Sequence, residues 1–197
     1  MPARVDVPGP LVVGVLLAAG AGRRFGRPKA LVAAADGRSW AAATARRLTE
    51  AGCAPVRVVL GAGAEEAAAA LDREDVELVV ATDWADGMSA SLRAALTELA
   101  VAAPDAEAAL VHLVDLPDVG TDVLRRLLAL APDGGTGVLA RATYDRAPGH
   151  PVLLGREHWD AVAESVHGDR GARDYLAARD VANVECGDLA SGRDVDR

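Results

Sequence analysis

The stretch Leu11-Val12-Val13-Gly14-Val15-Leu16-Leu17, followed by a loop from Ala18 to Lys29, decides the fold class of this chain. The seven quoted residues form a continuous apolar run, which is typical of a strand buried on both faces of a parallel sheet. In a doubly wound sheet, ligands bind outside the carboxyl ends of the strands. The loop after this first strand is therefore the expected place for a ligand site.

Alternating strand and helix patterns continue along the chain. Apolar runs predict further strands at 56–60, 76–81, 108–114 and 137–141, and helical patterns are found at 39–50, 65–71, 89–101 and 121–130. We expect Gly52 to end the first helix and Ser89 to cap the third helix. This order predicts an α/β fold with a doubly wound, mostly parallel sheet and helices on both faces.

The pattern changes after residue 141. A turn at Arg146-Ala147-Pro148-Gly149 is expected between the strand at 137–141 and a short apolar run at 151–154. Helical stretches at 156–165 and 172–179 precede a last strand at 181–185. No repeat, low-complexity linker or shift in composition divides the chain, so the sequence predicts a single domain over residues 1–197.

Composition limits the classes of partner. The 197 residues include 21 Lys and Arg against 29 Asp and Glu, a formal net charge of −8. This acidic balance argues against generic binding to nucleic acids or anionic membranes. No apolar run reaches the roughly 20 residues of a membrane span, and the start lacks a signal peptide. Cys53 and Cys186 have no metal-ligand spacing, so we expect a cytoplasmic protein with two reduced thiols.

The loop at 17–29 concentrates both glycine and positive charge. Glycines at positions 20, 22 and 26 let backbone N–H groups approach an anion closely. Arg23, Arg24, Arg27 and Lys29 place four cations within seven residues of an otherwise acidic chain. This concentration predicts a polyphosphate site.

Glycine-rich loops that bind phosphate have three common sequence patterns, and this loop matches one of them. A Walker loop needs a G-K-[ST] ending, whereas Gly26 is followed by Arg27-Pro28. A dinucleotide fingerprint needs a third glycine where Phe25 stands, and an acidic residue that the second strand lacks at its end. The remaining pattern, G-x-G-x-R-x-G-x-P-K, is matched at every position from Gly20 to Lys29.

Residues 17–29 thereby resemble the signature of the molybdenum-cofactor nucleotidyltransferase family. The form Ala18-Ala19-Gly20 is similar to its cytidylyltransferase branch. Three further segments resemble motifs of that branch, namely residues 83–92, Gly149-His150-Pro151-Val152 and Gly168-Asp169-Arg170-Gly171-Ala172-Arg173. The resemblance spans residues 12–196. It implies a Mg²⁺-dependent enzyme that moves CMP from CTP to a phosphorylated acceptor, molybdopterin, and releases pyrophosphate.

The resemblance also implies roles for single residues. Arg24 would hold the β- and γ-phosphates, Lys29 would reach the α-phosphate, and Asp115, which closes the fourth strand, would bind the metal; these are the three catalytic candidates. His150 and Arg173 would bind the acceptor. The nucleotide-binding candidates are Leu17, Ala18, Ala19, Gly20, Ala21, Gly22, Arg23, Arg24, Lys29, Gly87, Ser89 and Ser91.

A second metal-binding carboxylate is expected at Asp169, with Asp194 and Asp196 as alternatives. Asp194-Val195-Asp196 resembles the start of a closing family motif, but the chain stops at Arg197. Asp118 is the better candidate for capping the helix after the fourth strand. Leu116 stands where the family commonly has Gln, which removes a polar contact but leaves the metal site.

Several alternatives remain open at the level of sequence. Ser89 is explained equally well as a helix cap, and His150 as a loop histidine bonded to backbone. His112, inside the fourth strand, is expected to be a core histidine with a backbone partner. The acceptor could instead be a phosphosugar, phospholactate or methylerythritol phosphate, and the nucleotide could be GTP. A different class is a non-catalytic accessory protein for a molybdenum hydroxylase, which is also a candidate partner of the enzyme.

Overall fold

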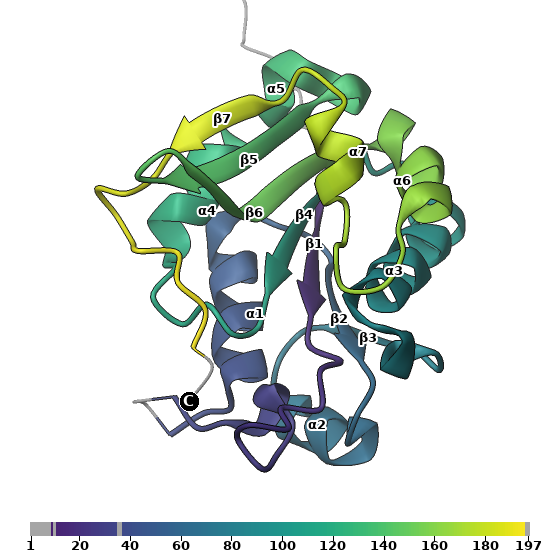
Figure 1. Ribbon diagram of the computed structural model, residues 1–197, viewed down its shortest axis with the longest axis vertical. Helices are drawn as coiled ribbons and strands as arrows, with labels where there is room; N and C mark the ends of the chain where they lie inside the picture. Colours follow the sequence, from purple (N-terminus) through teal and green to yellow (C-terminus); the bar gives the residue numbers. More distant parts are fainter. Residues whose placement is uncertain (1–8, 10, 35–36, 196–197) are drawn as a thin grey trace, which may run out of the picture.

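The computed structural model describes residues 9, 11–34 and 37–195. Within these ranges, seven strands form one sheet in the order β3-β2-β1-β4-β6-β5-β7 (Figure 1). The strands are β1 (Val12–Leu17), β2 (Val56–Leu60), β3 (Glu77–Val80), β4 (Ala108–Leu113), β5 (Leu139–Tyr144), β6 (Ala147–Gly155) and β7 (Ala182–Glu185). The expected alternation of strands and helices is confirmed as far as β5.

The helices of the described ranges connect these strands. The α-helices are α1 (Trp40–Ala51), α2 (Ala64–Leu71), α3 (Met88–Ala102), α4 (Thr121–Leu128), α5 (Ala131–Gly134), α6 (Trp159–Ser165) and α7 (Arg173–Ala177). Short 3₁₀ turns are η1 (Lys29–Leu31), η2 (Trp84–Asp86), η3 (Gly135–Gly137) and η4 (Arg156–His158). In this part of the chain, no helix combines the length and the apolar character needed to cross a membrane.

The strand directions make the sheet mixed but mostly parallel. β1 pairs in parallel with β2 and β4, β2 with β3, and β5 with β7, whereas β6 is antiparallel to both β4 and β5. The expected turn between β5 and β6 is present, but its predicted position at 146–149 is wrong, because residues 147–149 already lie within β6. The turn is instead formed by Asp145 and Arg146, whose φ angles of 51° and 68° suit a tight two-residue hairpin.

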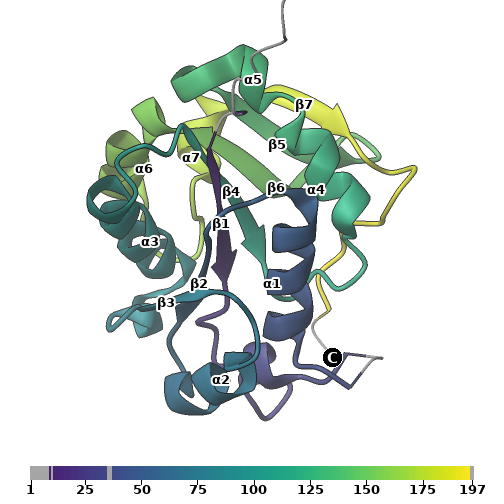
Figure 2. The same cartoon turned by 180° about the vertical axis from the view of Figure 1, so that it is seen from behind.

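Two apolar layers cover the two faces of the sheet. One cluster joins α1, α2 and α4 to alternate residues of β1 and β4, including Leu16 and Leu110. The other joins α3, α6 and α7 to the residues in between, including Val15 and Val111 (Figure 2). Because side chains alternate along a strand, a run that is apolar at every position can serve both layers. All six residues of β1 are buried, as the opening sequence predicts.

The ends of two helices test the capping predictions. Ser39 accepts a hydrogen bond from the Ala42 amide, and Gly52 ends α1 in a left-handed conformation, as expected. The prediction for Ser89 is wrong: α3 begins at Met88, its N-cap is Gly87, and Ser89 is fully buried. Ser89 therefore contributes inside the protein and not as the helix cap.

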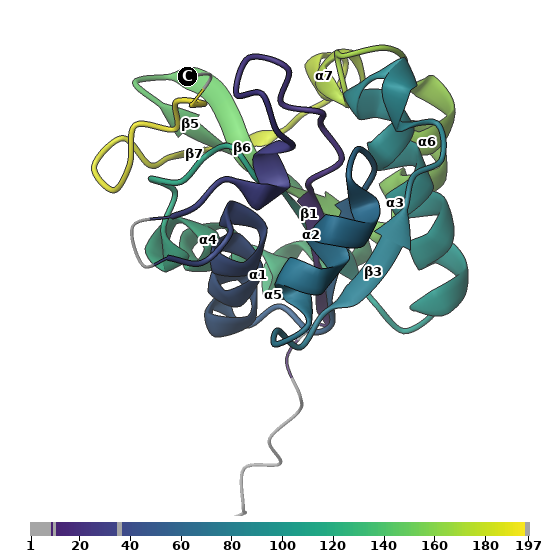
Figure 3. The same cartoon turned by 90° about the horizontal axis from the view of Figure 1, so that it is seen from below.

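The order in which strands are added to the sheet changes sides at β1. From β1 the chain proceeds to β2 and β3 on one side, and β4 then lies on the other side of β1. Leu17 and Leu113 are register partners, so both strands end at the same edge, seen from below in Figure 3. Such a switch point is where doubly wound sheets bind ligands.

Candidate functional site

The loop after β1 is folded tightly upon itself. Gly22 adopts a φ of 56°, and the Phe25 amide donates to the Gly22 carbonyl at 2.8 Å. A Cβ at Gly22 would overlap the carbonyl oxygen of Arg27, so only glycine fits there. The Phe25 ring meets Trp40 edge to face with 5.6 Å between ring centroids, which anchors the loop to α1. The sequence therefore fixes the shape of this loop.

A cavity of about 380 Å³ opens beside this loop at the switch point. Nine of the predicted nucleotide-binding residues line it. They are Leu17, Ala19, Gly20, Ala21, Gly22, Arg23, Lys29, Gly87 and Ser91. Asp115 and Asp169, the two carboxylates expected to bind metal, line the same cavity. The structure thus gathers residues that are up to 152 positions apart in the sequence, from Leu17 to Asp169, around one hollow.

Three predicted nucleotide-binding residues do not line this cavity. Ala18 is buried and its amide donates to the Val59 carbonyl at 2.9 Å, which leaves that N–H unavailable to a ligand. Arg24 is exposed, and the neighbouring Arg23 lines the cavity in its place. Ser89 is buried, and its Oγ accepts a hydrogen bond from the Gly171 amide at 3.2 Å.

Lys29 and Asp115 form an ion pair across the cavity wall. Lys29 Nζ lies 2.7 Å from Asp115 Oδ2, and the two side chains are only 18% and 19% exposed. Lys29 begins the short turn η1, and Asp115 lies two residues beyond β4. The loop after β1 and the segment after the neighbouring strand β4 thus bring together a cation and a carboxylate that are 86 residues apart. The site holds its central charges in place by mutual attraction.

Asp169 is attached to the start of α3. Its Oδ1 accepts a hydrogen bond from the Met88 amide at 3.3 Å, so it satisfies an N–H group that the helix itself leaves free. Gly87 has a φ of 107°, and a Cβ there would lie 2.6 Å from Asp169 Oδ1. Because Gly87 has no side chain, the loop at 168–171 can dock against the helix.

The carboxylates suit a hard cation that also binds phosphate. Within the described ranges, no group of three His, Cys, Asp or Glu residues could hold a metal alone. Mg²⁺ usually binds one or two carboxylates and completes its shell with substrate phosphates and water. Asp115 and Asp169 at one cavity match that donor set. Asp194 is exposed and does not line the cavity, and Asp196 lies outside the described residues.

The residues that follow Asp115 differ from two expectations. Asp118 does not cap α4, whose N-cap is Gly120; its carboxylate accepts hydrogen bonds from Ser191 N and Oγ at 2.7 and 2.6 Å. It thereby holds the C-terminal segment, and the Val195 amide donates to the Asp115 carbonyl at 3.0 Å. Leu116 is buried in the apolar layer of α1 and α4, so an amide side chain has no place there.

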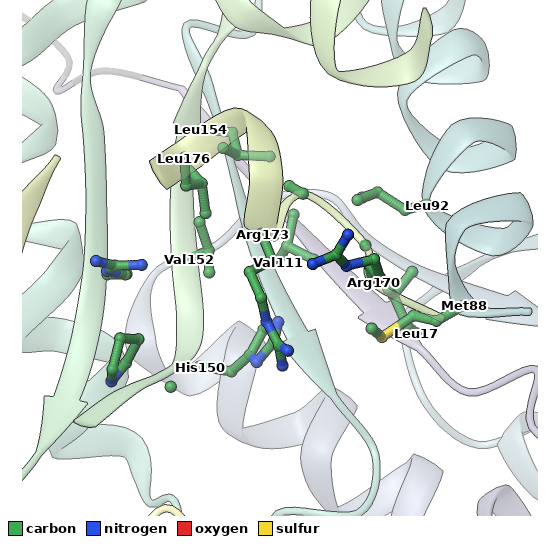
Figure 4. A pocket seen from close by; sticks show the side chains of 15 residues that line it. Leu17, Met88, Leu92, Val111, His150, Val152, Leu154, Arg170, Arg173 and Leu176 are labelled. Carbon is green, nitrogen blue, oxygen red and sulfur yellow. The ribbon is translucent and has the colours of Figure 1, made fainter. Parts of the chain in front are cut away.

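A second pocket of about 150 Å³ adjoins the larger cavity and shares Leu17 and Met88 with it (Figure 4). His150 and Arg173, the residues expected to bind the acceptor, both line this pocket. Burial lowers the pKa of His150 to about 4; the positive charge of Arg173 adds to this effect, and the negative charge of Asp115 opposes it. The imidazole is therefore neutral at pH 7.

His112 is a core histidine, as the sequence predicts, but it lacks the expected backbone partner among the described residues. It is fully buried in β4, and neither ring nitrogen has a hydrogen-bond partner in the described part of the chain. Burial lowers its pKa to about 3, and nearby positive charge on His150 and Arg47 would contribute in the same direction. The neighbours of His112 on this face of the chain, such as Leu110 and Val114, are apolar side chains that offer no hydrogen-bond partner.

Sequence reasoning missed the aromatic wall of the large cavity. Trp84, in the turn η2, lines the cavity, and its side chain lies so close to Gly61 that a Cβ at Gly61 would come within 2.5 Å of it. The chain has only three tryptophans, and this one lies within the motif at 83–92. That placement is the signal that could have identified it.

Comparison with known proteins gives four findings. A family model described as a MobA-like NTP transferase domain matches residues 14–184. The nicotine blue oxidoreductase of Paenarthrobacter nicotinovorans is 38% identical over 194 residues, covering 95% of this chain and 93% of that protein. The crystal structure of Rv0371c from Mycobacterium tuberculosis H37Rv has a TM-score of 0.75 and 29% identity, covering 90% of this chain and 89% of that one. A structure of Rv0371c in complex with manganese has a TM-score of 0.72 and 27% identity, covering 89% of this chain and 88% of that one.

Proposed function

Because this chain belongs to the family of MobA-like NTP transferase domains, we propose that it transfers CMP from CTP to a phosphorylated acceptor and releases pyrophosphate. The acceptor implied by the family resemblance is molybdopterin. The proposed enzyme is a single cytoplasmic domain that uses Mg²⁺ and supplies a molybdenum hydroxylase. One observation carries this proposal: the glycine-rich loop, Lys29 and Asp115 surround one cavity at the switch point of the sheet.

The loop residues are proposed to bind the triphosphate. Gly20, Ala21 and Gly22 line the cavity and carry no large side chains, which suits close contact of their backbone N–H groups with phosphate oxygens. Arg23 lines the cavity, and Arg24 is exposed beside it, so both supply positive charge at the loop. We assign the β- and γ-phosphates to this part of the site.

Lys29 is proposed to act at the α-phosphate. The acceptor phosphate oxygen attacks the α-phosphorus, a new P–O bond forms, and the bond to the bridging oxygen breaks. The bonding electrons leave with pyrophosphate. Negative charge grows on the oxygens around the α-phosphorus, so a fixed cation there lowers the barrier more than it strengthens substrate binding. The contact with Asp115 keeps the ammonium group at this place.

Asp115 and Asp169 are proposed to hold Mg²⁺ together with the nucleotide phosphates. When bound, the metal would neutralise phosphate charge and orient the triphosphate. Support comes from the shared cavity of the two carboxylates and from the manganese complex of the relative Rv0371c. Asp169 has the additional task of keeping the start of α3 in place through the Met88 amide.

The nucleobase is proposed to lie against the start of α3. Gly87 leaves room for the ring, and Ser91 offers a hydroxyl to the pyrimidine edge. Ser89 supports this region from inside through its bond to Gly171. A preference for CTP over GTP follows from the resemblance of Ala18-Ala19-Gly20 to the cytidylyltransferase branch, with GTP as the alternative.

The test is release of pyrophosphate by the purified protein and three variants. Asp115→Ala should abolish transfer while leaving the fold intact, and Asp194→Ala should leave it unchanged because Asp194 lies outside the cavity. Lys29→Ala should lower kcat more than it weakens NTP binding. Turnover of Asp115→Ala within about tenfold of the parent at saturating Mg²⁺ would contradict the metal role.

A second candidate function follows from the nicotine blue oxidoreductase, which is 38% identical to this chain. An oxidoreductase of this architecture would need an electron donor, for which a nicotinamide cofactor is the first choice. The site argues against the usual binding mode, because β2 is followed by Gly61 pressed against Trp84 and not by an acidic residue. Oxidation of reduced nicotinamide with a dye acceptor, absent with NTP alone, would favour this second function.

A further inference from the structure

The pocket beside the nucleotide cavity is apolar on its inner walls. Seven aliphatic or thioether side chains line it, drawn from β1, α3, β4, β6 and α7. They are Leu17, Met88, Leu92, Val111, Val152, Leu154 and Leu176 (Figure 4). Surface of this kind favours a ligand part that water solvates poorly. An aliphatic wall on several sides is suited to the faces of a flat ring.

The polar side chains of this pocket are nearly all cationic. Arg141, Arg170 and Arg173 line it, together with the neutral His150. Arg141 donates to Asn183 at 2.7 Å, and Arg170 pairs with Asp174 at 3.1 Å. The guanidinium of Arg173 has no hydrogen bond or ion pair to the residues that the structure describes, and Figure 4 shows it directed toward His150. One arginine is therefore available to a ligand anion.

Acidic, amide and hydroxyl side chains are missing from the described walls of this pocket, which leaves one His150 ring nitrogen as the side-chain acceptor there. Among the described residues that line the pocket, none is an Asp, Glu, Asn, Gln, Ser or Thr. A ring with amino and amide N–H groups on its edge would leave most of those donors without side-chain partners, and each unpaired buried donor costs binding free energy. A pterin is such a ring. A plain aromatic ring has no such donors.

We infer that this pocket binds a single apolar aromatic ring that carries a phosphate or carboxylate group. The ring would lie among the aliphatic walls, and the anionic group would meet Arg173. The volume of about 150 Å³ matches this size, since an apolar protein cavity of roughly that volume holds one benzene molecule. His150 adds no charge, but one ring nitrogen accepts and the other donates a hydrogen bond.

The position of the pocket connects this ligand to the proposed reaction. Leu17 and Met88 line both cavities, so a ligand in this pocket lies beside the nucleotide cavity. The inference rests on the proposed function only in identifying the ring with the acceptor. It narrows the acceptor to phosphorylated aromatic compounds and makes the pterin of molybdopterin a weaker ligand than a plain ring.

The experiment measures binding to the full chain without nucleotide, by ligand-observed NMR titration. The probes are phenyl phosphate, the neutral benzyl alcohol and 6-carboxypterin. We expect phenyl phosphate to bind at least about tenfold more tightly than benzyl alcohol, the factor typical of one charge-assisted hydrogen bond. It should also bind more tightly than 6-carboxypterin, because most of the ring N–H donors of the pterin lack side-chain partners in the pocket. Equal or tighter binding of 6-carboxypterin would overturn the inference.

Two matched variants locate the binding. Arg173→Gln should weaken phenyl phosphate about tenfold or more and leave benzyl alcohol unchanged. Arg46→Gln removes an exposed arginine of α1 that lies outside the pocket, so it should change the affinity less than about threefold. Equal losses in the two variants would show general attraction to positive charge and contradict a built site.

The same titration separates this inference from the proposed function. If phenyl phosphate binds as expected but no NTP yields pyrophosphate, the pocket assignment stands and the nucleotidyl transfer fails. If pyrophosphate is released with molybdopterin while phenyl phosphate does not bind, the transfer stands and the pocket assignment fails. A third variant, Met88→Gln, adds an amide to the wall and should weaken phenyl phosphate while strengthening 6-carboxypterin.

Discussion

Replacing His112 with leucine should make the protein more stable at neutral pH. His112 is fully buried in β4, and neither imidazole nitrogen has a hydrogen-bond partner among the described residues. A buried polar group without a partner costs about 1–3 kcal/mol, whereas an apolar side chain of similar volume has no such cost. The neighbours on this face, such as Leu110 and Val114, belong to an apolar cluster. We expect His112→Leu to raise the free energy of unfolding by about 1–2 kcal/mol at pH 7.5.

The same substitution should change how stability depends on pH. Burial lowers the pKa of His112 from 6.5 to about 3, so between these values the unfolded chain binds a proton that the folded chain does not. The free energy of unfolding therefore falls as the pH falls through this window. One proton corresponds to about 1.4 kcal/mol per pH unit, so His112 accounts for up to about 2.7 kcal/mol between pH 6.5 and 4.5. In the His112→Leu variant, this part of the decrease in the free energy of unfolding should be absent.

Urea unfolding followed by tryptophan fluorescence at pH 7.5 and 4.5 measures both effects. His150, whose pKa is lowered to about 4, contributes a parallel slope that persists in the variant. His158→Leu is the matched control, because His158 is hydrogen-bonded to Tyr175 Oη at 2.9 Å and to the Gly137 carbonyl at 3.1 Å. It should be destabilising. A destabilised His112→Leu variant with the parent's pH slope would refute the reasoning.

Three further predictions concern the loop, the start of α3 and the sheet. Gly22→Ala should reduce NTP affinity more than Gly26→Ala, measured by calorimetry, because both have positive φ but only Gly22 faces a backbone carbonyl that a Cβ would overlap. Asp169→Ala should lower the free energy of unfolding by about 1 kcal/mol through loss of the Met88 amide contact, while Asp169→Asn keeps that contact and lowers only kcat. Arg57→Ala should cost about 2–3 kcal/mol in urea unfolding, since Arg57 is buried and pairs with two half-exposed glutamates, and Arg57→Met should cost less.

Much of the fold follows from local sequence patterns. The apolar run of β1 and the glycine-rich loop after it are strong signals, because burial on both faces and positive φ angles each demand particular residues. The direction of β6 is not encoded in its own composition. It depends on the hairpin at Asp145 and Arg146, two residues that rarely adopt positive φ, and Glu185 from β7 holds that hairpin by accepting bonds from both amides. Such a long-range contact is invisible in a local pattern.

In the candidate site, too, some features follow from the local sequence and others depend on the folded structure. The spacing of the loop places Lys29 near the sheet edge, and the position after β4 does the same for Asp115, so their meeting is predictable. Whether Arg23 or Arg24 lines the cavity is not predictable from the sequence, because the turn at Gly22 decides which side chain faces the cavity. The role of Ser89 is not predictable for a similar reason: α3 starts one residue earlier than its pattern suggests, and the Gly171 amide donates to the serine Oγ.

Pyrophosphate release with each of the four NTPs, Mg²⁺ and purified molybdopterin tests the central claim most directly, with Asp115→Ala as the control. The account predicts acceptor-dependent release with CTP that is lost in the control. A parallel reaction with phenyl phosphate as the acceptor tests the phosphorylated aromatic compounds inferred for the smaller pocket. The proposed function would be contradicted if no NTP gave pyrophosphate with either acceptor and the protein oxidised a reduced nicotinamide in the presence of a dye.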